Sequence, residues 1–252
     1  MFRDYYEPLP DREKYLERIG LKGLVPDGTL ETLNKIIPAH VRSIPFENLD
    51  VHVKNIVPSL KVRDLYDKII VRERGGWCHE LNGLFSSFLS ALGYHTYQVV
   101  ARVLTRGFKT PIGHRGNICV IDDKKYYCDV GFGDRSFMSA IPLDGTQTPY
   151  GYYVVMNGDW YEIRFGEQPV VCFADIKFEP MDFVFANQYI ATNQEELFKS
   201  TMYVSLIEGN ARKLFLKDEL TLKVDGQTTV LAHAENEEEA MRIIKEHFGI
   251  EF

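Results

Sequence analysis

The spacing of apolar residues changes near residue 93, and this change separates a helical first part from a strand-rich remainder. Before that point, apolar side chains recur three and four positions apart, which is the period of an amphipathic helix. The clearest stripe runs from Leu81 to Leu92 and ends at Gly93, a residue type that commonly terminates helices. Weaker stripes predict three earlier helices, near residues 11–20, 29–37 and 62–70.

Beyond Gly93, short runs rich in valine, tyrosine and isoleucine alternate with turn-forming residues, as strands and hairpins do. Asp122-Asp123 separates one pair of runs and Asn157-Gly158-Asp159 separates another, so each predicts a hairpin. The first strands are expected at residues 95–103, 117–121, 125–130, 152–156, 160–165 and 170–178. Later strands are expected at residues 202–208, 213–216, 220–224 and 228–232, before a last helix capped by Asn236. This order favours an α+β fold, with an antiparallel sheet or small barrel in the middle, over a doubly wound sheet.

Composition and charge narrow the class of protein. The 252 residues are 45% hydrophobic and 26% charged, which is ordinary for a globular chain. The net charge of -7 and the absence of a basic stripe argue against a nucleic acid or an anionic membrane as partner. No apolar run approaches the roughly 20 residues of a membrane span, and residues 1–8 lack the apolar region of a signal peptide. We therefore expect a cytoplasmic protein with free thiols, and no metal site, because CxxC and HExxH spacings are absent.

Cys78 is the first candidate for chemistry. It follows Gly75-Gly76 and directly precedes the most regular helix. The positive end of a helix dipole favours a thiolate at such a position, and the glycines leave space beside the sulfur. A buried structural cysteine is the alternative interpretation, and position alone does not choose between the two. The other cysteines, Cys119, Cys128 and Cys172, are most simply core thiols.

His114 and Asp129 are candidates for the base that such a nucleophile needs and for the group that orients the base. The midpoint between them falls at the Asp122-Asp123 turn, so the hairpin returns Asp129 to within a residue or two of His114. From the hairpin alone, a surface pair of histidine and aspartate is the simpler interpretation. Asp129 is also followed by Gly131-Phe132-Gly133, which predicts a loop able to approach a ligand, or a plain tight turn.

Taken together, these residues resemble the arylamine N-acetyltransferases. The shared segments keep the family's order and spacing over about residues 10–200: Ile44–Leu49, Arg74–Cys78, Glu80 with Asn82–Phe85, Ala101–Val103, His114 and Asp129–Gly133. The Arg-Gly-Gly-aromatic-Cys run and the Asp-Val-Gly-Phe-Gly run are specific to the family when they occur together.

The resemblance implies a fold in three parts and a defined reaction. Residues 1–92 would form a helical bundle that carries the nucleophile, residues 93–186 a β-barrel that carries the histidine and aspartate, and residues 187–252 an α/β lid. The reaction would move an acetyl group from acetyl-CoA to an arylamine or arylhydrazine, by a ping-pong mechanism through an acetyl-cysteine. It would need no metal or prosthetic group. The catalytic residues would be Cys78, His114 and Asp129.

The same resemblance gives roles to further positions. Arg74 would pair with Glu47 and Asn48 and support the loop that carries Cys78, and Asn82 would lie near the triad, one turn further along the helix. The residues expected to bind substrate are Phe46, Val103, Phe132, Gly133 and Phe198. Core packing is the alternative role for Val103.

Two departures from the family pattern bear on specificity. His79 stands where the family has an aromatic or aliphatic residue, and Gly113-His114-Arg115-Gly116-Asn117 differs from the family's segment around the histidine. The acceptor, the acyl chain and the oligomeric state are left open. A related Cys-His-Asp enzyme, such as an amide synthase or thiol hydrolase, and a non-catalytic module that binds CoA or an aromatic ligand are the rival interpretations.

Overall fold

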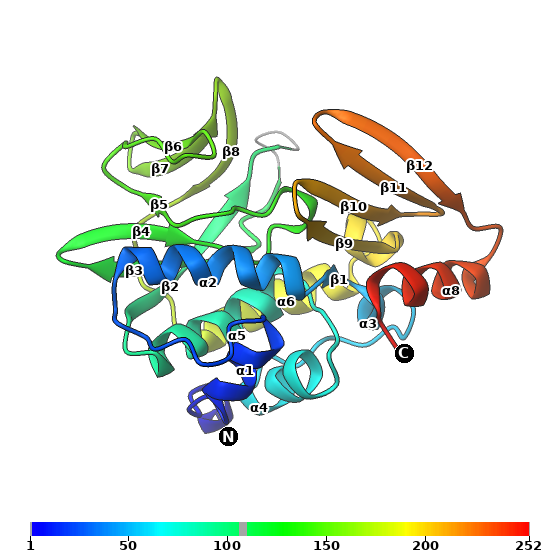
Figure 1. The fold of residues 1–252 in the computed structure, drawn as a ribbon, viewed down its shortest axis with the longest axis horizontal. Coiled ribbons are helices and arrows are strands. Elements are labelled where there is room, and N and C mark those ends of the chain that lie inside the picture. Colours follow the sequence, from blue (N-terminus) through cyan, green and yellow to red (C-terminus); the bar gives the residue numbers. More distant parts are fainter. Residues whose placement is uncertain (1, 106–109, 252) are drawn as a thin grey trace.

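The structure, a computed structural model, describes residues 2–105 and 110–251 (Figure 1). It has the expected α+β architecture, with helices of the first part on one side and two antiparallel sheets on the other (Figure 1). The helices of the first part are α1 (Arg12–Arg18), α2 (Leu30–Ser43), α3 (Leu49–His52), α4 (Val62–Tyr66) and α5 (Cys78–Ala91), after a short 3-10 turn η1 (Arg3–Tyr5). None of the described helices is long and apolar enough to cross a membrane.

Helix α5 is the central element of the helical part and is buried along most of its length. Its apolar stripe packs against α1, α2 and α4, with Leu84, Phe85 and Phe88 fully shielded from solvent. The helix begins at Cys78 because Trp77 is extended and its backbone N–H donates to the Glu80 carboxylate at 3.1 Å, half of a capping box.

The helix expected at residues 62–70 is divided in the structure. After α4 the chain widens into a π-turn, η2 (Asp67–Val71), in which the Arg72 N–H donates to the Asp67 carbonyl. The wider turn aims Lys68 inward, where it forms ion pairs with Asp50 at 2.7 Å and Glu80 at 2.8 Å. The spacing of apolar residues in the sequence did not predict these buried ion pairs.

The middle part forms a seven-stranded antiparallel sheet that curls into a nearly closed barrel. Its order is β5-β4-β3-β2-β8-β7-β6. The strands are β2 (His95–Val103), β3 (His114–Ile121), β4 (Lys124–Cys128), β5 (Ile141–Pro142), β6 (Tyr152–Asn157), β7 (Trp160–Phe165) and β8 (Gln168–Phe173). β5 lies beside β6, but no ladder of hydrogen bonds joins the two among the described residues. A 3-10 turn, η3 (Gly133–Arg135), separates β4 from β5.

Both predicted hairpins are present. Asp122 and Asp123 turn with φ of 48° and 61°, and Gly158, with φ of 61°, begins the two-residue turn between β6 and β7. The strand expected at 170–178 is shorter than predicted, because β8 ends at Phe173. Asp175 then leaves the sheet, and its carboxylate accepts from Tyr97 and Lys125.

The last part contains the four expected strands and the expected helix. The strands β9 (Tyr203–Glu208), β10 (Ala211–Leu216), β11 (Glu219–Val224) and β12 (Gln227–His233) form a second sheet, on which α8 (Glu237–Phe248) packs. Asn236 caps α8 by accepting from the Glu239 N–H at 2.9 Å. The sheet takes its first strand from the helical part, because β1 (Phe46–Glu47) pairs with β9.

Two helices that the sequence did not predict connect the sheets: α6 (Phe183–Thr192), which follows the turn η4 (Pro180–Asp182), and α7 (Leu197–Ser200). α6 was missed because both of its faces carry apolar residues. Its inner face buries Phe183 and Ile190, whereas Phe185 on the outer face is 84% exposed. The boundary expected after residue 186 falls inside this helix, and the three-part division of the chain remains a prediction.

Candidate active site

Cys78 lies in the wall of a cavity. The loop before it is held in place because its two glycines pack very closely against the neighbouring chain. Gly75 lies against the backbone of Pro45, and a side chain there would meet the Pro45 carbonyl oxygen at 2.1 Å. The Gly76 carbonyl accepts from the Glu47 N–H at 3.0 Å. Only glycine tolerates such contacts, so the Gly-Gly pair fixes the loop against β1.

His114 and Asp129 meet as the hairpin predicted. β3 and β4 pair with Asn117 opposite Cys128, which places Asp129 two positions from the register partner of His114. The His114 Nε2 atom lies 2.6 Å from Asp129 Oδ2. This leaves Nδ1 as the nitrogen available to Cys78. Both the histidine and the aspartate are buried, so the surface pair is excluded.

The electrostatics of this pair favour a charged histidine. Burial acts to lower the pKa of His114, but the Asp129 carboxylate and a hydrogen bond with Cys78 outweigh it and raise the pKa of His114 to about 10. Burial likewise acts to raise the pKa of Asp129, but His114 and the hydrogen bonds that Asp129 accepts hold it below its usual value. The arrangement therefore suits an imidazolium between a carboxylate and a sulfur.

Asn82 joins α5 to both strands of the hairpin. Its Nδ2 donates to Asp129 Oδ1 at 2.7 Å and to the Arg115 carbonyl at 2.6 Å, while its Oδ1 accepts from the Val130 N–H at 2.9 Å. The Gly131 N–H also donates to Asp129 Oδ1, at 2.8 Å. The Asp129 carboxylate is thus held in one orientation from several sides.

Tyr127 is a fourth partner of Asp129 that was not predicted. Its hydroxyl donates to Asp129 Oδ2 at 3.0 Å, the same oxygen that contacts His114. The tyrosine ring fits there because residue 116 is glycine: a Cβ at Gly116 would lie 2.5 Å from the ring. Strand alternation was the available signal, since Tyr127 lies two positions before Asp129 and therefore on the same face.

Buried ion pairs support the loop that carries Cys78. Arg74 donates to Glu47 at 2.7 Å, as expected, and to Asp50 at 3.3 Å. Lys68, which was not predicted, binds Asp50 and Glu80. Burial outweighs the attraction of Lys68 and raises the pKa of Glu80 to about 7.

Asn48 holds a different segment from the one expected. Its side chain donates to the carbonyls of Phe198 at 2.6 Å and Thr201 at 2.7 Å, and accepts from the Tyr203 N–H at 2.8 Å. It thereby fixes α7 and the start of β9 opposite Cys78. Asn48 supports the wall of the cavity.

The cavity itself has a volume of about 350 Å³, and both Cys78 and His114 line it. All the residues expected to bind substrate also line it: Phe46, Val103, Phe132, Gly133 and Phe198. Several residues of its wall were not predicted: Ile190, Tyr203, Leu214 and Leu216. They belong to α6, β9 and β10, which the tertiary structure brings to the cavity from the last part of the chain. The rings of Phe46, Phe198 and Tyr203 contact one another with centroids 5.4–5.5 Å apart. This is a mainly apolar and aromatic chamber with a sulfur and an imidazole in its wall.

Gly131 and Gly133 allow the loop after Asp129 to reach the cavity. A side chain at Gly131 would lie 2.8 Å from the Cys78 Cα atom. Gly133 has φ of +75°, a conformation that favours glycine. Between them, the Phe132 ring meets the His114 ring edge-on at 5.3 Å. The loop was expected to approach a ligand, and it does line the cavity.

His79 and the other cysteines lie away from the cavity wall. His79 is fully buried between the rings of Trp77 and Phe183, and burial holds its pKa well below the usual value, so it is neutral. Burial raises the pKa of the Cys119 thiol to about 12 and that of Cys128 well above its usual value. Cys119 and Cys128 are core groups, as expected, whereas Cys172 on β8 is only half-buried.

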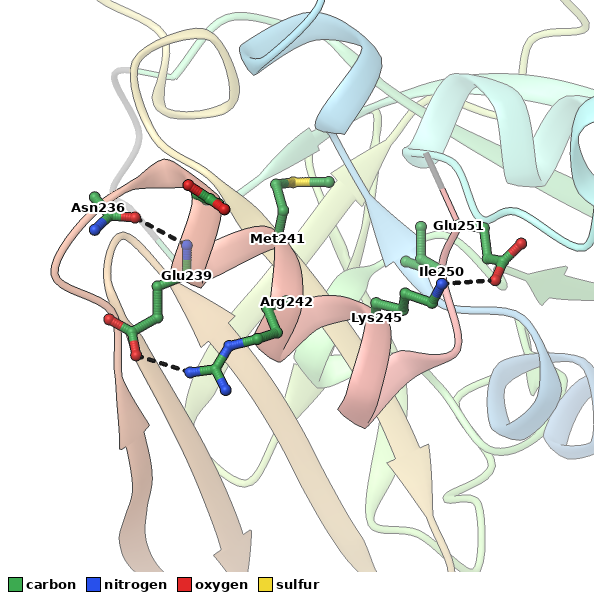
Figure 2. Close-up of a pocket in the computed structure, with 8 residues that line it drawn as sticks. Asn236, Glu239, Met241, Arg242, Lys245, Ile250 and Glu251 are labelled. Atoms are coloured by element: carbon green, nitrogen blue, oxygen red, sulfur yellow. Dashed lines mark hydrogen bonds and ion pairs between the residues drawn. The ribbon is translucent and has the colours of Figure 1, made fainter.

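A second hollow of about 740 Å³ lies along α8 (Figure 2). Its two basic side chains are already paired with acids: Arg242 with Glu239 at 2.9 Å, and Lys245 with Glu251 at 2.9 Å (Figure 2). It contains neither a cysteine nor a histidine. The described residues also contain no group of three or more histidine, cysteine, aspartate or glutamate side chains that would hold a metal ion. The chemistry therefore belongs to the cavity at the start of α5.

Comparison with known proteins shows which family the fold and the cavity belong to. A model of the N-acetyltransferase family matches residues 29–252. The arylamine N-acetyltransferase of Mycolicibacterium smegmatis is 33% identical over 79% of this chain and 77% of its own length. The solved M. smegmatis structure superposes with a TM-score of 0.87 at 31% identity, covering 96% of this chain and 92% of its own. The Mycobacterium marinum arylamine N-acetyltransferase in complex with CoA gives 0.86 at 25% identity, covering 95% and 93%.

The fold and the matched length define an acyltransferase. The chain belongs to the arylamine N-acetyltransferase family. The resemblance seen in the sequence is thus confirmed.

Proposed function

We propose that this protein moves an acetyl group from acetyl-CoA to an arylamine or arylhydrazine through an acetylated Cys78. The observation that carries the proposal is the His114–Asp129 contact of 2.6 Å beside a thiol in the wall of an aromatic cavity. The names of the relatives support the acceptor class, and the M. marinum complex supports CoA as carrier of the acetyl group. The four free thiols fit a reducing cytoplasm.

In the first half-reaction the Cys78 thiolate attacks the thioester carbonyl carbon of acetyl-CoA. A carbon–sulfur bond to Cys78 forms, the bond to the CoA sulfur breaks, and that sulfur takes the proton held by His114. The backbone N–H groups of Cys78 and His79 come before the first N–H that bonds back to Trp77, that of Glu80, and they are the candidate donors to the oxyanion. Such donors contribute about 3 kcal/mol each in measured cases.

In the second half-reaction the amine nitrogen attacks the acetyl group on Cys78. The carbon–nitrogen bond forms, the carbon–sulfur bond breaks, and His114 accepts the amine proton, which restores the thiolate–imidazolium pair. Asp129 fixes the orientation of the imidazole in both steps. The rings of Phe46, Phe132 and Phe198 suit an aromatic acceptor, because ring contacts add about 0.5–1.5 kcal/mol beyond buried area. A neutral arylamine is also a free nucleophile at neutral pH.

The test is the intact mass of the protein after incubation with acetyl-CoA and no acceptor. We expect one acetyl adduct on the wild type, none on Cys78→Ala, and an unchanged adduct on Cys172→Ala, which removes a half-buried thiol outside the cavity. Addition of an arylamine should then remove the adduct and yield the acetylated amine. Absence of an adduct on the wild type, or its persistence in Cys78→Ala, would overturn the proposal.

The same experiment separates the rival functions. A thiol hydrolase would lose the adduct to water at the same rate with and without amine. A pure binding module would form no adduct, and its Cys78 would react with iodoacetamide no faster than an ordinary thiol.

A further inference from the structure

Glu196 places a carboxylate in the wall of the candidate active-site cavity. The residue directly precedes α7 and is half-buried. Its backbone is already engaged, because its N–H donates to the Asn193 carbonyl at 3.1 Å and its carbonyl accepts from the N–H groups of Lys199 at 3.1 Å and Ser200 at 3.0 Å. Its carboxylate has no hydrogen bond or ion pair with another residue that the structure describes. The carboxylate is therefore the polar group that Glu196 can offer to a ligand.

The segment that carries this carboxylate is held against the site. Asn48 donates to the Phe198 carbonyl at 2.6 Å, which ties α7 to the helical part. The Phe198 ring lines the cavity two residues after Glu196, and its centroid lies 6.3 Å from that of Trp77, the residue before Cys78. The start of α7 and the loop that carries Cys78 thus meet at the Phe198 ring.

Other charges in the cavity wall are few among the described residues. Apart from Cys78 and His114, the residues of the wall that carry a charge are Glu196 and Arg135, and no ion pair joins these two. Arg135, at the end of η3, is exposed, so water and salt screen its charge. A charge that is partly withdrawn from water acts more strongly on a ligand. The half-buried Glu196 is therefore the group best placed to distinguish ligands by their charge.

The cavity has room for a ring that carries a substituent. Its volume of about 350 Å³ is about twice the roughly 150 Å³ that holds a benzene molecule in an engineered cavity. A carboxylate can only accept hydrogen bonds, so it favours substituents with N–H donors, and cations above all. It repels a second carboxylate, and an apolar substituent placed against it removes water without replacing the lost hydrogen bonds.

We propose that Glu196 determines which acceptors the protein takes: arylamines with a cationic or N–H donor substituent on the ring, in preference to arylamines with a carboxylate. The inference rests on the proposed function and names the substrate class of its second half-reaction. The Glu196 carboxylate binds the substituent, while the arylamine nitrogen is free to attack acetylated Cys78. His114 still takes the amine proton, so Glu196 acts on the choice of acceptor and not on the proton transfer.

The test compares three anilines that differ at the para position: para-aminobenzylamine, which is cationic, para-aminobenzoate, which is anionic, and para-ethylaniline, which is apolar. The aliphatic amine of the first is protonated near pH 7, so its aniline nitrogen is the nucleophile. Each aniline is mixed with protein that was acetylated beforehand, and the second-order rate constant for loss of the acetyl group is measured. Each rate is divided by that of para-ethylaniline in the same protein. Comparing one aniline between two proteins then cancels the differences in nucleophilicity among the amines.

Glu196→Gln keeps the size of the side chain but removes its charge. From wild type to this variant, the relative rate of para-aminobenzylamine should fall about tenfold, because a hydrogen bond to a charged group contributes at least about this factor. The relative rate of para-aminobenzoate should rise about threefold or more. Glu195→Gln is the matched control, because Glu195 is exposed and lies outside the cavity wall. Its relative rates should stay within about twofold of the wild type.

Relative rates that are equal in the wild type and in Glu196→Gln would overturn the inference, and so would equal shifts in Glu196→Gln and Glu195→Gln. Glu196→Lys gives a second variant, in which para-aminobenzoate should become the faster of the two charged anilines. Failure of that reversal, with the fold intact by circular dichroism, would also contradict the inference. A shift found in Arg135→Gln but not in Glu196→Gln would assign the discrimination to Arg135 instead.

The proposed function fails separately, and is recognised by a wild-type protein that takes up no acetyl group. An acetylated wild type from which none of the anilines removes the acetyl group would contradict the acceptor class on which both proposals rest. An acetylated wild type that reacts with the anilines, but with relative rates independent of residue 196, would overturn this inference alone.

Discussion

Two groups of buried charges flank the start of α5, and they are built in opposite ways. On one side, Arg74 and Lys68 each contact carboxylates at 2.7–2.8 Å, so every cation has an acid beside it. On the other side, Asp129 is taken up by His114, while the cation of Arg115 meets only neutral acceptors. The first group pairs its two cations with three carboxylates, those of Glu47, Asp50 and Glu80, and it holds the backbone in place. The second leaves the Arg115 cation without an acid among the described residues.

The comparison separates residues that hold the site from residues that act on it. A cluster of mutually paired buried charges is sensitive to the loss of any one member, because each member is the partner of another. In the second group, His114 and Asp129 instead set each other's ionisation in the wall of the cavity. Variants of the first group should therefore alter stability above all, and variants of the second should alter how activity depends on pH.

The largest effect on the free energy of unfolding is expected for Arg74→Met. The change leaves the fully buried Glu47 carboxylate and Asp50 short of a partner. Breaking a buried pair in this way costs about 3–5 kcal/mol, measured as the free energy of unfolding in urea. Arg72→Met is the matched control, because Arg72 and Asp67 form an ion pair in which both side chains are 56% exposed. The control should lose less than about 1 kcal/mol. A similar loss in both variants would contradict the contrast between the two groups.

An intermediate effect on the free energy of unfolding is expected from a change in pH. The fold shifts the pKa values of two buried histidines, His40 and His114, in opposite directions. His40 lies between Tyr15 and Phe85 in the helical core, and burial lowers its pKa to about 3. The unfolded chain therefore binds a proton at His40 that the folded chain does not, below about pH 6.5. Stability falls as the pH falls through this window, by about 1.4 kcal/mol per pH unit for this residue. His79, which is also buried and neutral, acts in the same direction.

His114 acts in the opposite direction. Its pKa is raised to about 10 in the folded protein, so its contribution is fully present below about pH 6.5 and is lost as the pH rises towards 10. Urea unfolding at steps between about pH 5 and pH 7 measures how the free energy of unfolding changes with pH in the range where His40 acts. The variant His40→Leu should reduce the slope by about 1 kcal/mol per pH unit, averaged over this range, relative to the wild type. An unchanged slope would show that His40 is charged or exposed in the folded state.

Much of this site could be predicted from the sequence because its signals are local. Asp122-Asp123 predicts a hairpin, and the hairpin alone brings His114 near Asp129. The unbalanced charge of Arg115 has no such signal, because the absence of a partner is a property of the tertiary structure. Lys68 was hidden for a related reason: it faces inward only because the helix widens into a π-turn at that point. α6 was hidden because Phe185 on its outer face removes the contrast between apolar and polar sides.

The smallest effect on stability, and the most specific effect on activity, is expected for Tyr127→Phe. The change removes the hydroxyl that shares Asp129 Oδ2 with His114, at a cost of about 1–2 kcal/mol in the free energy of unfolding. The carboxylate then concentrates its charge on His114 and holds the imidazolium proton more tightly. Acetyl transfer should slow several-fold near neutral pH, and the alkaline limb of its pH profile should move upward. Tyr126→Phe is the matched control, since Tyr126 belongs to the helical core on the opposite face of β4. If the two variants share one pH profile and one chemical shift for the His114 Nε2 proton, then the Tyr127 hydroxyl does not act on the histidine.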